Sequence, residues 1–400
     1  MSGGAADRRV CGTLLHLGSH AADTVHGPFR IETFLNLASR SLVLALCRGD
    51  VRGAPPLLAR VHSSCMTSET FGGCDCDCAG QLDAALEAIA RAGRGVVFYL
   101  LQEGRGAGFV AKARDRMMVQ ASRDRVTTFD AYARMGLGRD YRRYDEVGFA
   151  AAALGVRASL ALLTNNPDKV AALRRANVAV ARVLPLERDA SPFNLHYLSA
   201  KSRSGHALSD PGQQARAAAT PPEPVAFFDP HPLPERARFL RVASYLLPIR
   251  TRAPGAAVHW FRLHAYFDLA TQRERVLFTY GRDAAATPLV RAERETLLAR
   301  LPLRERPAHA RWRDVVERIA RRGAGCALFI LHDDPAAVDA TRSADALVAA
   351  DDDLTWLLAQ HVPGRTGELL ADGAEASPDE AALCAALRRH GAALDVCPMA

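Results

Sequence analysis

Apolar residues in the first half of the chain recur at spacings that predict one helix and two buried strands. The helical set, spaced by one, three or four residues, is Leu82, Ala85, Leu86, Ile89 and Ala90. Gly93 follows this set as a stop signal. Residues 96–101 and 160–163 are continuous apolar runs, as expected of strands buried on both faces. Strands that lead through loops into helices predict a three-layer α/β arrangement.

Each apolar run leads into a loop with polar residues. Residues 102–108 read Gln-Glu-Gly-Arg-Gly-Ala-Gly, in which the glycines let the backbone approach a ligand and Arg105 can bind phosphate oxygens. Residues 164–167 read Thr-Asn-Asn-Pro, so Asn166 is a predicted N-cap and Pro167 suits the first helical position. Because such sheets bind ligands beyond the carboxyl ends of their strands, both loops are expected on the ligand side.

The chain divides into two units, and the sequence of the second resembles a diverged copy of the first. We predict domains at residues 1–204 and 225–400, joined by a linker at 205–224 that is rich in Ser, Gly, Gln, Ala and Pro. The matched segments are 29–31 with 261–263, 36–38 with 268–270, 48–50 with 281–283, 89–95 with 319–325, and 172–175 with 386–389. Chance matches of the common Ala and Arg are the alternative, but the conserved order favours a duplication with one late deletion.

Composition and charge exclude few functions. Hydrophobic residues make up 49% and charged residues 24%, which is ordinary for a globular protein. No apolar run approaches the ~20 residues of a membrane span, and the N-terminus lacks a signal-peptide core, so the expected location is the cytoplasm. The net charge of +7 suits an anionic small substrate such as a nucleoside triphosphate. A nucleic-acid role has only this charge in its favour, because no arginine tract carries interleaved aromatic residues.

Four of the nine cysteines fall within residues 65–78. Cys65, Cys76 and Cys78 form a C-x10-C-x-C pattern, and three thiolates make a soft site suited to zinc. Three protein ligands leave a position for water, whereas a fourth would close the site and make it structural. The cluster alone fits either kind of site. Cys74 is the ambiguous member, which we interpret as a bystander.

Two further polar segments indicate a function only when they are considered together with the other motifs. Asp140 lies beside two arginines, Arg142 and Arg143, which alone would be an ordinary charged surface. Thr164 and Lys169 flank a predicted helix N-terminus, where anions are favoured. Lys169 is notable because the chain has only two other lysines, at positions 112 and 201.

Together these motifs resemble the GTP cyclohydrolase II family, whose activity begins riboflavin synthesis. The similarity runs from about residue 9 to residue 208. The segments that stand in family order are 60–65, 76–78, 81–82, 93–95, 102–106, 164–167 and 197–208. The resemblance implies a three-layer α/β/α domain with a mixed sheet and, through the repeat, a degenerate second domain of similar fold.

The resemblance also implies a role for each matched residue. Cys65, Cys76 and Cys78 would hold one zinc ion. Asp140 matches the family's proposed proton acceptor, and Arg142 its proposed nucleophile toward the α-phosphate. Because a guanidinium stays protonated, we expect Arg142 to stabilise phosphoryl charge instead. The residues expected around GTP are Arg60, Val61, His62, Ser63, Ser64, Gln81, Glu103, Gly104, Arg105, Thr128, Thr164 and Lys169.

The implied reaction opens the imidazole ring of GTP with zinc-activated water and releases pyrophosphate, with Mg²⁺ on the phosphates. The family carries a tyrosine a few residues after the lysine that Lys112 matches, but residues 114–118 read Arg-Asp-Arg-Met-Met. Members without this tyrosine can stop at the formamide. The product is therefore either the formamidopyrimidine or, after formate release, the 2,5-diamino-6-ribosylamino-pyrimidinone phosphate. The first product would suit a specialised pathway rather than riboflavin synthesis.

The second unit keeps none of this chemistry. Residues 332–335 read His-Asp-Asp-Pro where the first unit has its Gly-rich loop, and no cysteine cluster recurs. We expect a pseudo-enzyme domain that replaces a partner subunit, so the protein is either a homodimer or a tandem-domain pseudo-dimer. The alternative to an active cyclohydrolase is a non-catalytic GTP-binding regulator with a structural zinc. Retention of Asp140, Arg142 and the three cysteines argues against that alternative.

Overall fold

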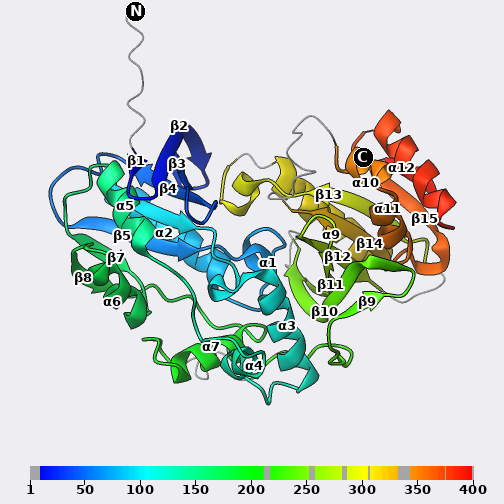
Figure 1. Cartoon of the computed structure of the whole chain (residues 1–400), viewed down its shortest axis with the longest axis horizontal. Coiled ribbons are helices and arrows are strands. Elements are labelled where there is room, and N and C mark those ends of the chain that lie inside the picture. The colour runs from blue at the N-terminus through cyan, green and yellow to red at the C-terminus, as the bar shows by residue number, and fades with distance from the viewer. Residues whose placement is uncertain are drawn as a thin grey trace, which may run out of the picture.

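The computed structural model describes residues 10–210, 217–251, 257–281, 286–304, 307–331, 343–373 and 375–398. Two eight-stranded mixed sheets organise them, one in each half of the chain (Figure 1). The first half contains β1 (Val10–Cys11), β2 (Leu14–Thr24), β3 (Gly27–Asn36), β4 (Leu42–Arg48), β5 (Leu57–Ser63), α1 (Met66–Glu69), α2 (Cys78–Ala92), β6 (Gly95–Leu100), η1 (Gly104–Gly106), α3 (Gly108–Ala121), α4 (Thr128–Arg134), α5 (Asp145–Ala153), β7 (Leu160–Leu163), α6 (Pro167–Arg175), β8 (Val180–Leu184) and α7 (Leu195–Arg203). The second half contains β9 (His231–Leu233), β10 (Arg236–Arg250), β11 (Val258–Asp268), β12 (Arg273–Tyr280), β13 (Leu289–Arg294), η2 (Leu297–Arg300), α9 (Pro307–Arg322), β14 (Gly325–Ile330), α10 (Ala344–Ala350), α11 (Asp352–Ala359), η4 (Pro363–Arg365), β15 (Thr366–Ala371), α12 (Pro378–Arg389) and β16 (Ala393–Pro398).

The two sheets have the same strand order and the same strand directions. The first runs β1-β2-β3-β4-β6-β5-β7-β8, and the second runs β9-β10-β11-β12-β14-β13-β15-β16. In the first sheet the pairings from β1 to β6 are antiparallel and those from β6 to β8 are parallel. The second sheet repeats this pattern from β9 to β14 and from β14 to β16. The predicted second domain of similar fold is confirmed.

Matched turns repeat the same local hydrogen bonds. The side chain of Asn36 caps the turn after β3 by accepting from the second and third backbone N–H groups beyond it. Asp268 caps the turn after β11 in the same way. The predicted match of residues 36–38 with 268–270 therefore holds at the level of individual bonds.

One predicted match moves by a residue. The strand ladders pair the residue before Gly49 with the first residue of β6, and the residue before Gly281 with the first residue of β14. Both glycines have positive φ, +60° and +77°, where a side chain is disfavoured. Gly49 is therefore equivalent to Gly281. The predicted match of 48–50 with 281–283 paired position 49 with position 282, so it is wrong by one residue.

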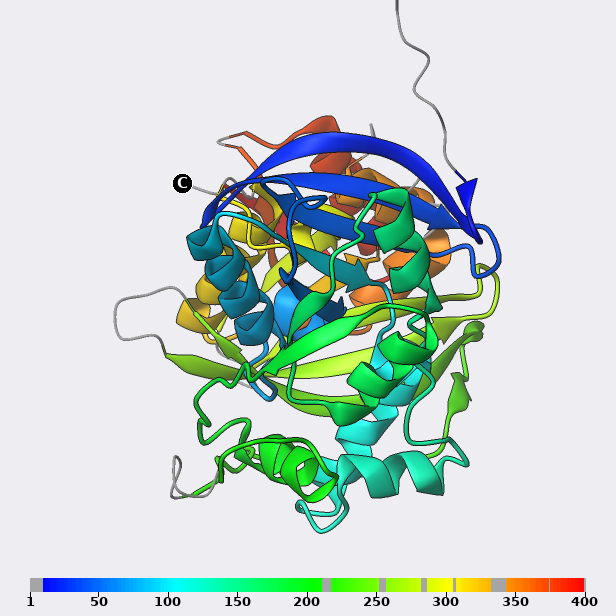
Figure 2. The same ribbon diagram turned by 90° about the vertical axis from the view of Figure 1, so that its left-hand side faces the viewer.

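Helices cover both faces of each sheet, as predicted. In the first half α2 packs on one face, and α5 and α6 pack on the other (Figure 2). In the second half α10, α11 and α12 cover one face, whereas α9 covers the other together with α3 of the first half. The second core is thus shared between the halves. In the described part of the chain, no helix has the length and apolar character that crossing a bilayer requires.

The elements predicted for the first half are also confirmed. The predicted helical set lies in α2, which ends where Gly93 adopts a left-handed φ of 71°. The apolar runs at 96–101 and 160–163 form β6 and β7. Asn166 caps α6 by accepting from the backbone N–H of Asp168 at 2.9 Å, and Pro167 occupies the first turn.

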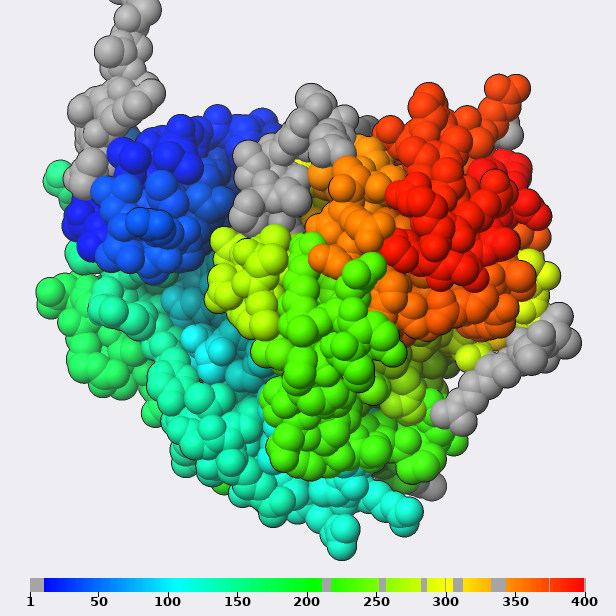
Figure 3. Space-filling model, turned by 45° about the vertical axis from the view of Figure 1, so that its right-hand side comes forward, coloured from blue at the N-terminus to red at the C-terminus, as the bar shows by residue number. Residues whose placement is uncertain are grey.

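The two halves exchange equivalent loops where they meet. The loop after β5 pairs with the end of β10 through a bridge between Gly73 and Ile249. The loop after β13 pairs with the end of β2 through a bridge between Thr24 and Leu303. The space-filling view shows the second half in direct contact with the surface of the first (Figure 3). This reciprocal pattern is that of a two-fold symmetric dimer interface, formed inside one chain.

The predicted domain boundaries at residues 204 and 225 stay predictions. Inside the predicted linker, the Ala207 N–H donates to the carbonyl of Asn165, and the Ala219 N–H donates to the carbonyl of Pro192. Residues 211–216 lie outside the described part of the chain. These bonds hold residues 207 and 219 against the first half, whereas Glu223 near the end of the linker pairs with Arg262 of the second half.

Replacing Gly281 with Ala is expected to destabilise the protein more than replacing Gly323. Both glycines have positive φ, +77° and +85°, so both variants incur the ~1–2 kcal/mol of a left-handed residue. A Cβ at Gly281 would also lie 1.8 Å from the carbonyl oxygen of Gly323, whereas a Cβ at Gly323 meets no atom within 4 Å. We expect Gly281→Ala to lower the free energy of unfolding by about 1–3 kcal/mol more than Gly323→Ala in urea denaturation. Equal losses would contradict the close backbone approach.

Candidate functional site

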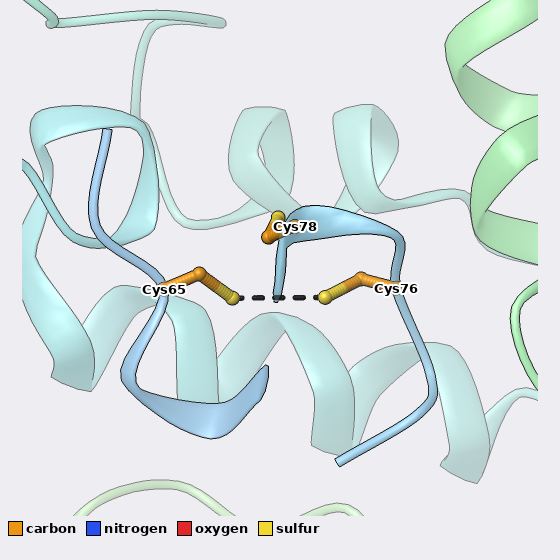
Figure 4. A group of neighbouring side chains, drawn as sticks. All are labelled: Cys65, Cys76 and Cys78. Atoms are coloured by element: carbon orange, nitrogen blue, oxygen red, sulfur yellow. Dashed lines mark hydrogen bonds between the residues drawn. The ribbon is translucent and has the colours of Figure 1, made fainter. Parts of the chain in front are cut away.

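Three cysteine thiols converge at the end of β5. Cys65 follows β5 directly, whereas Cys76 and Cys78 lie where the chain enters α2. The three sulfur atoms lie within 4.8 Å of one another, and the Sγ atoms of Cys65 and Cys76 point toward each other at 3.6 Å (Figure 4). Thiolates at ~2.3 Å from a tetrahedral zinc ion would be about 3.8 Å apart. The residues therefore fit a soft divalent metal.

Cys74 faces away from this cluster. Its Sγ lies 3.3 Å from the carbonyl oxygen of Pro248 in the second half, and its backbone N–H donates to the same oxygen at 2.9 Å. Burial raises the pKa of the Cys74 thiol to about 12, which keeps it protonated. The metal-ligating group found among the described residues holds only the other three thiols. A metal ion held by these three thiols would have its remaining coordination position on the side of the cavities that Cys78 lines.

Lys112 in α3 places a positive charge beside the thiols. Its Nζ lies 3.0 Å from Cys65 Sγ and 2.7 Å from a carboxylate oxygen of Glu103. Glu103 in turn accepts from the Met66 backbone N–H at 2.6 Å. Three thiolates around a divalent cation carry a net negative charge, so a buried ammonium group lowers the cost of burying them.

Two adjoining cavities surround the cluster. The larger, about 190 Å³, lies beyond the carboxyl ends of β5 and β7, and the smaller, about 70 Å³, is lined by all three thiols. Both are lined by Ser63, Cys78, Arg105, Arg142 and Tyr197. The predicted site residues along the larger cavity are Arg60, His62, Ser63, Gln81, Arg105, Asp140, Arg142, Thr164 and Lys169. Those along the smaller one are Ser63, Ser64, Glu103, Gly104, Arg105, Thr128 and Arg142.

The larger cavity concentrates buried positive charge. Arg60 and Lys169 are 5% exposed each, and Arg142 lies beside them on the cavity wall. Burial, with the charges of Arg60 and Arg142, lowers the pKa of Lys169 well below its ordinary value. The Lys169 ammonium donates to the Val61 carbonyl at 2.8 Å, so Val61 contributes its backbone rather than its side chain. Such a surplus of cations favours phosphate groups.

Asp140 and Arg142 form a forked ion pair on the wall of the larger cavity. The Arg142 Nε lies 2.9 and 3.1 Å from the two carboxylate oxygens of Asp140, and the Arg142 backbone N–H also donates to that carboxylate. Burial alone would raise the pKa of Asp140, but these hydrogen bonds outweigh it and hold the pKa below its ordinary value. The pair therefore presents an ionised carboxylate and an oriented guanidinium.

Several residues of the site had no assigned role in the sequence analysis. All three lysines of the chain line the two cavities. The scarcity of lysine, which drew attention to Lys169, could therefore also have indicated Lys112 and Lys201 as site residues. Lys201 is held by Asp77, with 2.6 Å between Nζ and Oδ1. Further lining residues without a predicted role are Asp115, Arg116, Phe129, Tyr132, Arg139, Asn165, Asp168, Tyr197, Ser204, His206 and Leu208.

Among the residues that the structure describes, Arg291 of the second half is the equivalent of Arg60. Arg60 pairs with the second residue after Gly95, and Arg291 pairs with the second residue after Gly325. Both arginines donate Nη1 to a backbone carbonyl of the neighbouring parallel strand, at 3.0 and 2.7 Å. The surroundings differ, because Arg291 lies among carboxylates. These are Glu293, Asp345, Asp372 and Glu380. Residues 332–335, predicted to replace the Gly-rich loop of the first half, lie outside the described residues.

Comparisons with known proteins concern the half that carries the cysteines. Residues 17–185 match the family model described as GTP cyclohydrolase II. GTP cyclohydrolase-2 of Pseudomonas putida (strain GB-1) is 40% identical over 191 residues, which cover 48% of this chain and 91% of that protein. GTP cyclohydrolase-2 of Pseudomonas aeruginosa (strain UCBPP-PA14) is 41% identical over 186 residues, which cover 46% and 89%.

Among solved structures, RibBX, a two domain 3,4-dihydroxy-2-butanone 4-phosphate synthase from A. baumannii, matches with a TM-score of 0.26 and 17% sequence identity. That match covers 44% of this chain and 41% of the other. The sequence relatives decide the assignment, because this chain spans nine-tenths of their length at 40% identity. Through its first half, the chain belongs to the GTP cyclohydrolase II family.

Proposed function

We propose that the chain is a zinc-dependent hydrolase that opens the imidazole ring of GTP and releases pyrophosphate. One observation carries the proposal: a three-cysteine cluster adjoins a cavity lined by buried cations, and both lie in the half that belongs to the family. A metal site that faces a cavity suits catalysis, whereas a structural site would be closed by a fourth ligand. The cations suit a triphosphate.

The residues of the larger cavity divide the work of this reaction. Arg60 and Lys169 would bind the phosphates together with Mg²⁺. The guanine ring would then point toward the cysteines. Zinc held there would act as a Lewis acid that lowers the pKa of water to about 7. Asp140 would accept the proton released on attack at C8. Arg142 would offset the charge that develops when pyrophosphate leaves, because a guanidinium stays protonated.

We further propose that the reaction stops at the formamide. Beyond Lys112, α3 lines the smaller cavity with Arg116 rather than a tyrosine, and Asp75 holds this guanidinium at 3.1 Å. A guanidinium is a poor proton donor at neutral pH. The phenols of this cavity come from other helices: Tyr132 donates its hydroxyl to a backbone carbonyl at 2.8 Å, and the ring of Tyr197 lies beneath Arg116. These contacts support a product that keeps the formyl carbon.

Zinc-loaded protein incubated with GTP and Mg²⁺ is expected to yield pyrophosphate and a formamidopyrimidine nucleotide without free formate. Mass spectrometry of the product and a formate assay measure this outcome. Cys65→Ser should abolish turnover because it removes a metal ligand, whereas Cys74→Ser should retain it because that thiol faces Pro248. Stoichiometric formate would contradict the partial reaction. Bound GTP without turnover would favour the regulatory alternative.

The affinity for GTP is expected to weaken as the pH rises above the lowered pKa of Lys169. In the free protein, burial and the neighbouring arginines make Lys169 release its proton below its ordinary value of 10.5. A triphosphate favours the charged form, so binding takes up a proton in this window and the Kd rises with pH. By the same linkage, the free protein gains stability as pH rises through this window, because the unfolded chain still holds the proton.

Calorimetric titration with GTP across this pH range, in buffers of different ionisation enthalpy, measures the proton uptake. Lys169→Met should weaken binding and remove the proton uptake, whereas Lys201→Met should retain it because Lys201 is paired with Asp77. Proton uptake that persists in Lys169→Met would assign the titration to another group.

A further inference from the structure

The segment between Cys65 and Cys76, residues 66–75, is here called the metal loop. Its most buried side chain points into the second half rather than into its own. Phe71 is fully buried, and its ring centroid lies 4.9 Å from both Phe278 and Phe329 in edge-on contacts. Trp312 completes this cage and donates its indole N–H to the Phe71 carbonyl at 3.1 Å. One side chain thus anchors the loop through both apolar burial and a hydrogen bond.

The residue before Phe71 makes a second, polar anchor. Thr70 donates its hydroxyl to a carboxylate oxygen of Glu295 at 2.6 Å, and both residues are buried. Glu295 is itself oriented by two hydrogen bonds from Arg300, each of 2.9 Å. A hydrogen bond to a buried, oriented carboxylate is stronger than a neutral one.

The backbone of the metal loop makes a third anchor. Gly73 bridges to Ile249 at the end of β10, and the Cys74 N–H donates to the Pro248 carbonyl at 2.9 Å. The Arg250 N–H donates to the Gly72 carbonyl at 3.3 Å. Within the first half, the Gly73 N–H donates to the Thr67 carbonyl at 2.8 Å and Asp75 pairs with Arg116 at 3.1 Å. The side chains of residues 70 and 71 and the backbone of residues 72–74 take their other described partners from the second half.

We infer that the second half is a positioning element for the metal, and that it sets zinc affinity by ordering the metal loop before the ion binds. This inference rests on the proposed zinc site. Metal binding must otherwise order the backbone between Cys65 and Cys76, and that entropy would be lost from the affinity. Glu295, Trp312 and the aromatic cage remove this cost without touching the metal. They are positioning residues supplied by a half that contributes no thiol to the cluster.

Two conservative substitutions in the full chain test the inference. Thr70→Val removes the hydroxyl that reaches Glu295, and Trp312→Phe removes the N–H that reaches Phe71 while keeping an aromatic ring. Matched controls are Thr355→Val, which removes a buried hydroxyl bonded to Val348, and Trp356→Phe, both away from the loop. The readouts are the zinc Kd, from competition with a chelator and zinc alone, and amide hydrogen exchange of residues 70–74.

Both test variants are expected to weaken zinc binding about 10- to 100-fold, as loss of a ligand-orienting partner typically does. The loop amides should exchange faster, and both controls should stay within about two-fold of the wild-type Kd, well short of that range. Wild-type zinc uptake with unchanged affinity in both test variants would overturn the positioning role alone. A wild-type chain that takes up no zinc would overturn the metal site itself, and this inference with it.

Discussion

Three cysteine sulfur atoms held within 4.8 Å of one another are the constraint on which the first half depends. Like charges at this distance repel strongly in a buried site, so the arrangement requires a metal ion, protons or nearby cations. Lys112 meets part of this need from α3, and Glu103 orients it while also fixing the Met66 N–H of the metal loop. The Gly-rich loop, α3 and the cysteines thus form one connected polar network.

The reciprocal interface explains why the second half persists without the cysteine cluster. In each half the loop after the first parallel strand pairs with the partner half: Gly73 with Ile249, and Leu303 with Thr24. An isologous interface formed inside one chain has a high effective concentration, so it cannot be lost by dilution as a dimer can. The interface is symmetric in its backbone but not in its chemistry. Cys74 stands where the other half has Arg304, and only one of the two loops is flanked by thiols.

The sequence predicted those features whose signals are local. Gly93, Asn166 and Pro167 end or begin helices through their own backbone preferences, and each does so in the structure. The three cysteines were close enough in sequence for their convergence to follow from spacing. The partners of Lys112 and Lys201 were not predictable in this way, because Cys65 and Asp77 lie 47 and 124 residues away. Their positions depend on how helices pack, which periodicity does not encode.

The same reasoning applies to the interface between the halves. Apart from Met66, Phe71 is the large apolar residue of a loop made mostly of polar and small residues, and nothing in its neighbours indicates that its cage comes from residues beyond position 270. The repeat itself was visible, but its exact alignment required strand registers, because glycine and arginine recur around positions 48–50 and 281–283. The weak sequence identity between the halves was enough to reveal the repeat, but not to determine which residues are equivalent.

Arg60 and Arg291 are equivalent residues of the two halves, but their guanidinium groups have different hydrogen-bond partners. Each donates to the carbonyl of the adjacent parallel strand, so that bond belongs to the shared fold. In the second half the Nε of Arg291 is also satisfied, by Glu293 at 2.9 Å. In the first half the Nε of Arg60 is buried and has no hydrogen-bond partner among the residues that the structure describes. A buried unsatisfied donor is costly, and it is retained where a ligand completes it.

The carboxylates around Arg291 make the contrast electrostatic as well. Burial raises the pKa of Asp345 to about 7, with Arg291 lowering it and the carboxylates of Glu380, Glu293 and Asp372 raising it further. A phosphate brought to this position would meet carboxylates, and its desolvation would find no compensation. In the first half, burial together with Arg142 lowers the pKa of Arg60 to about 10, although Asp77 favours its charged form. Burial and Arg60 likewise lower the pKa of Lys169. A triphosphate would favour the charged forms of Arg60 and Lys169, whereas at Arg291 it would meet the carboxylates that already surround that guanidinium.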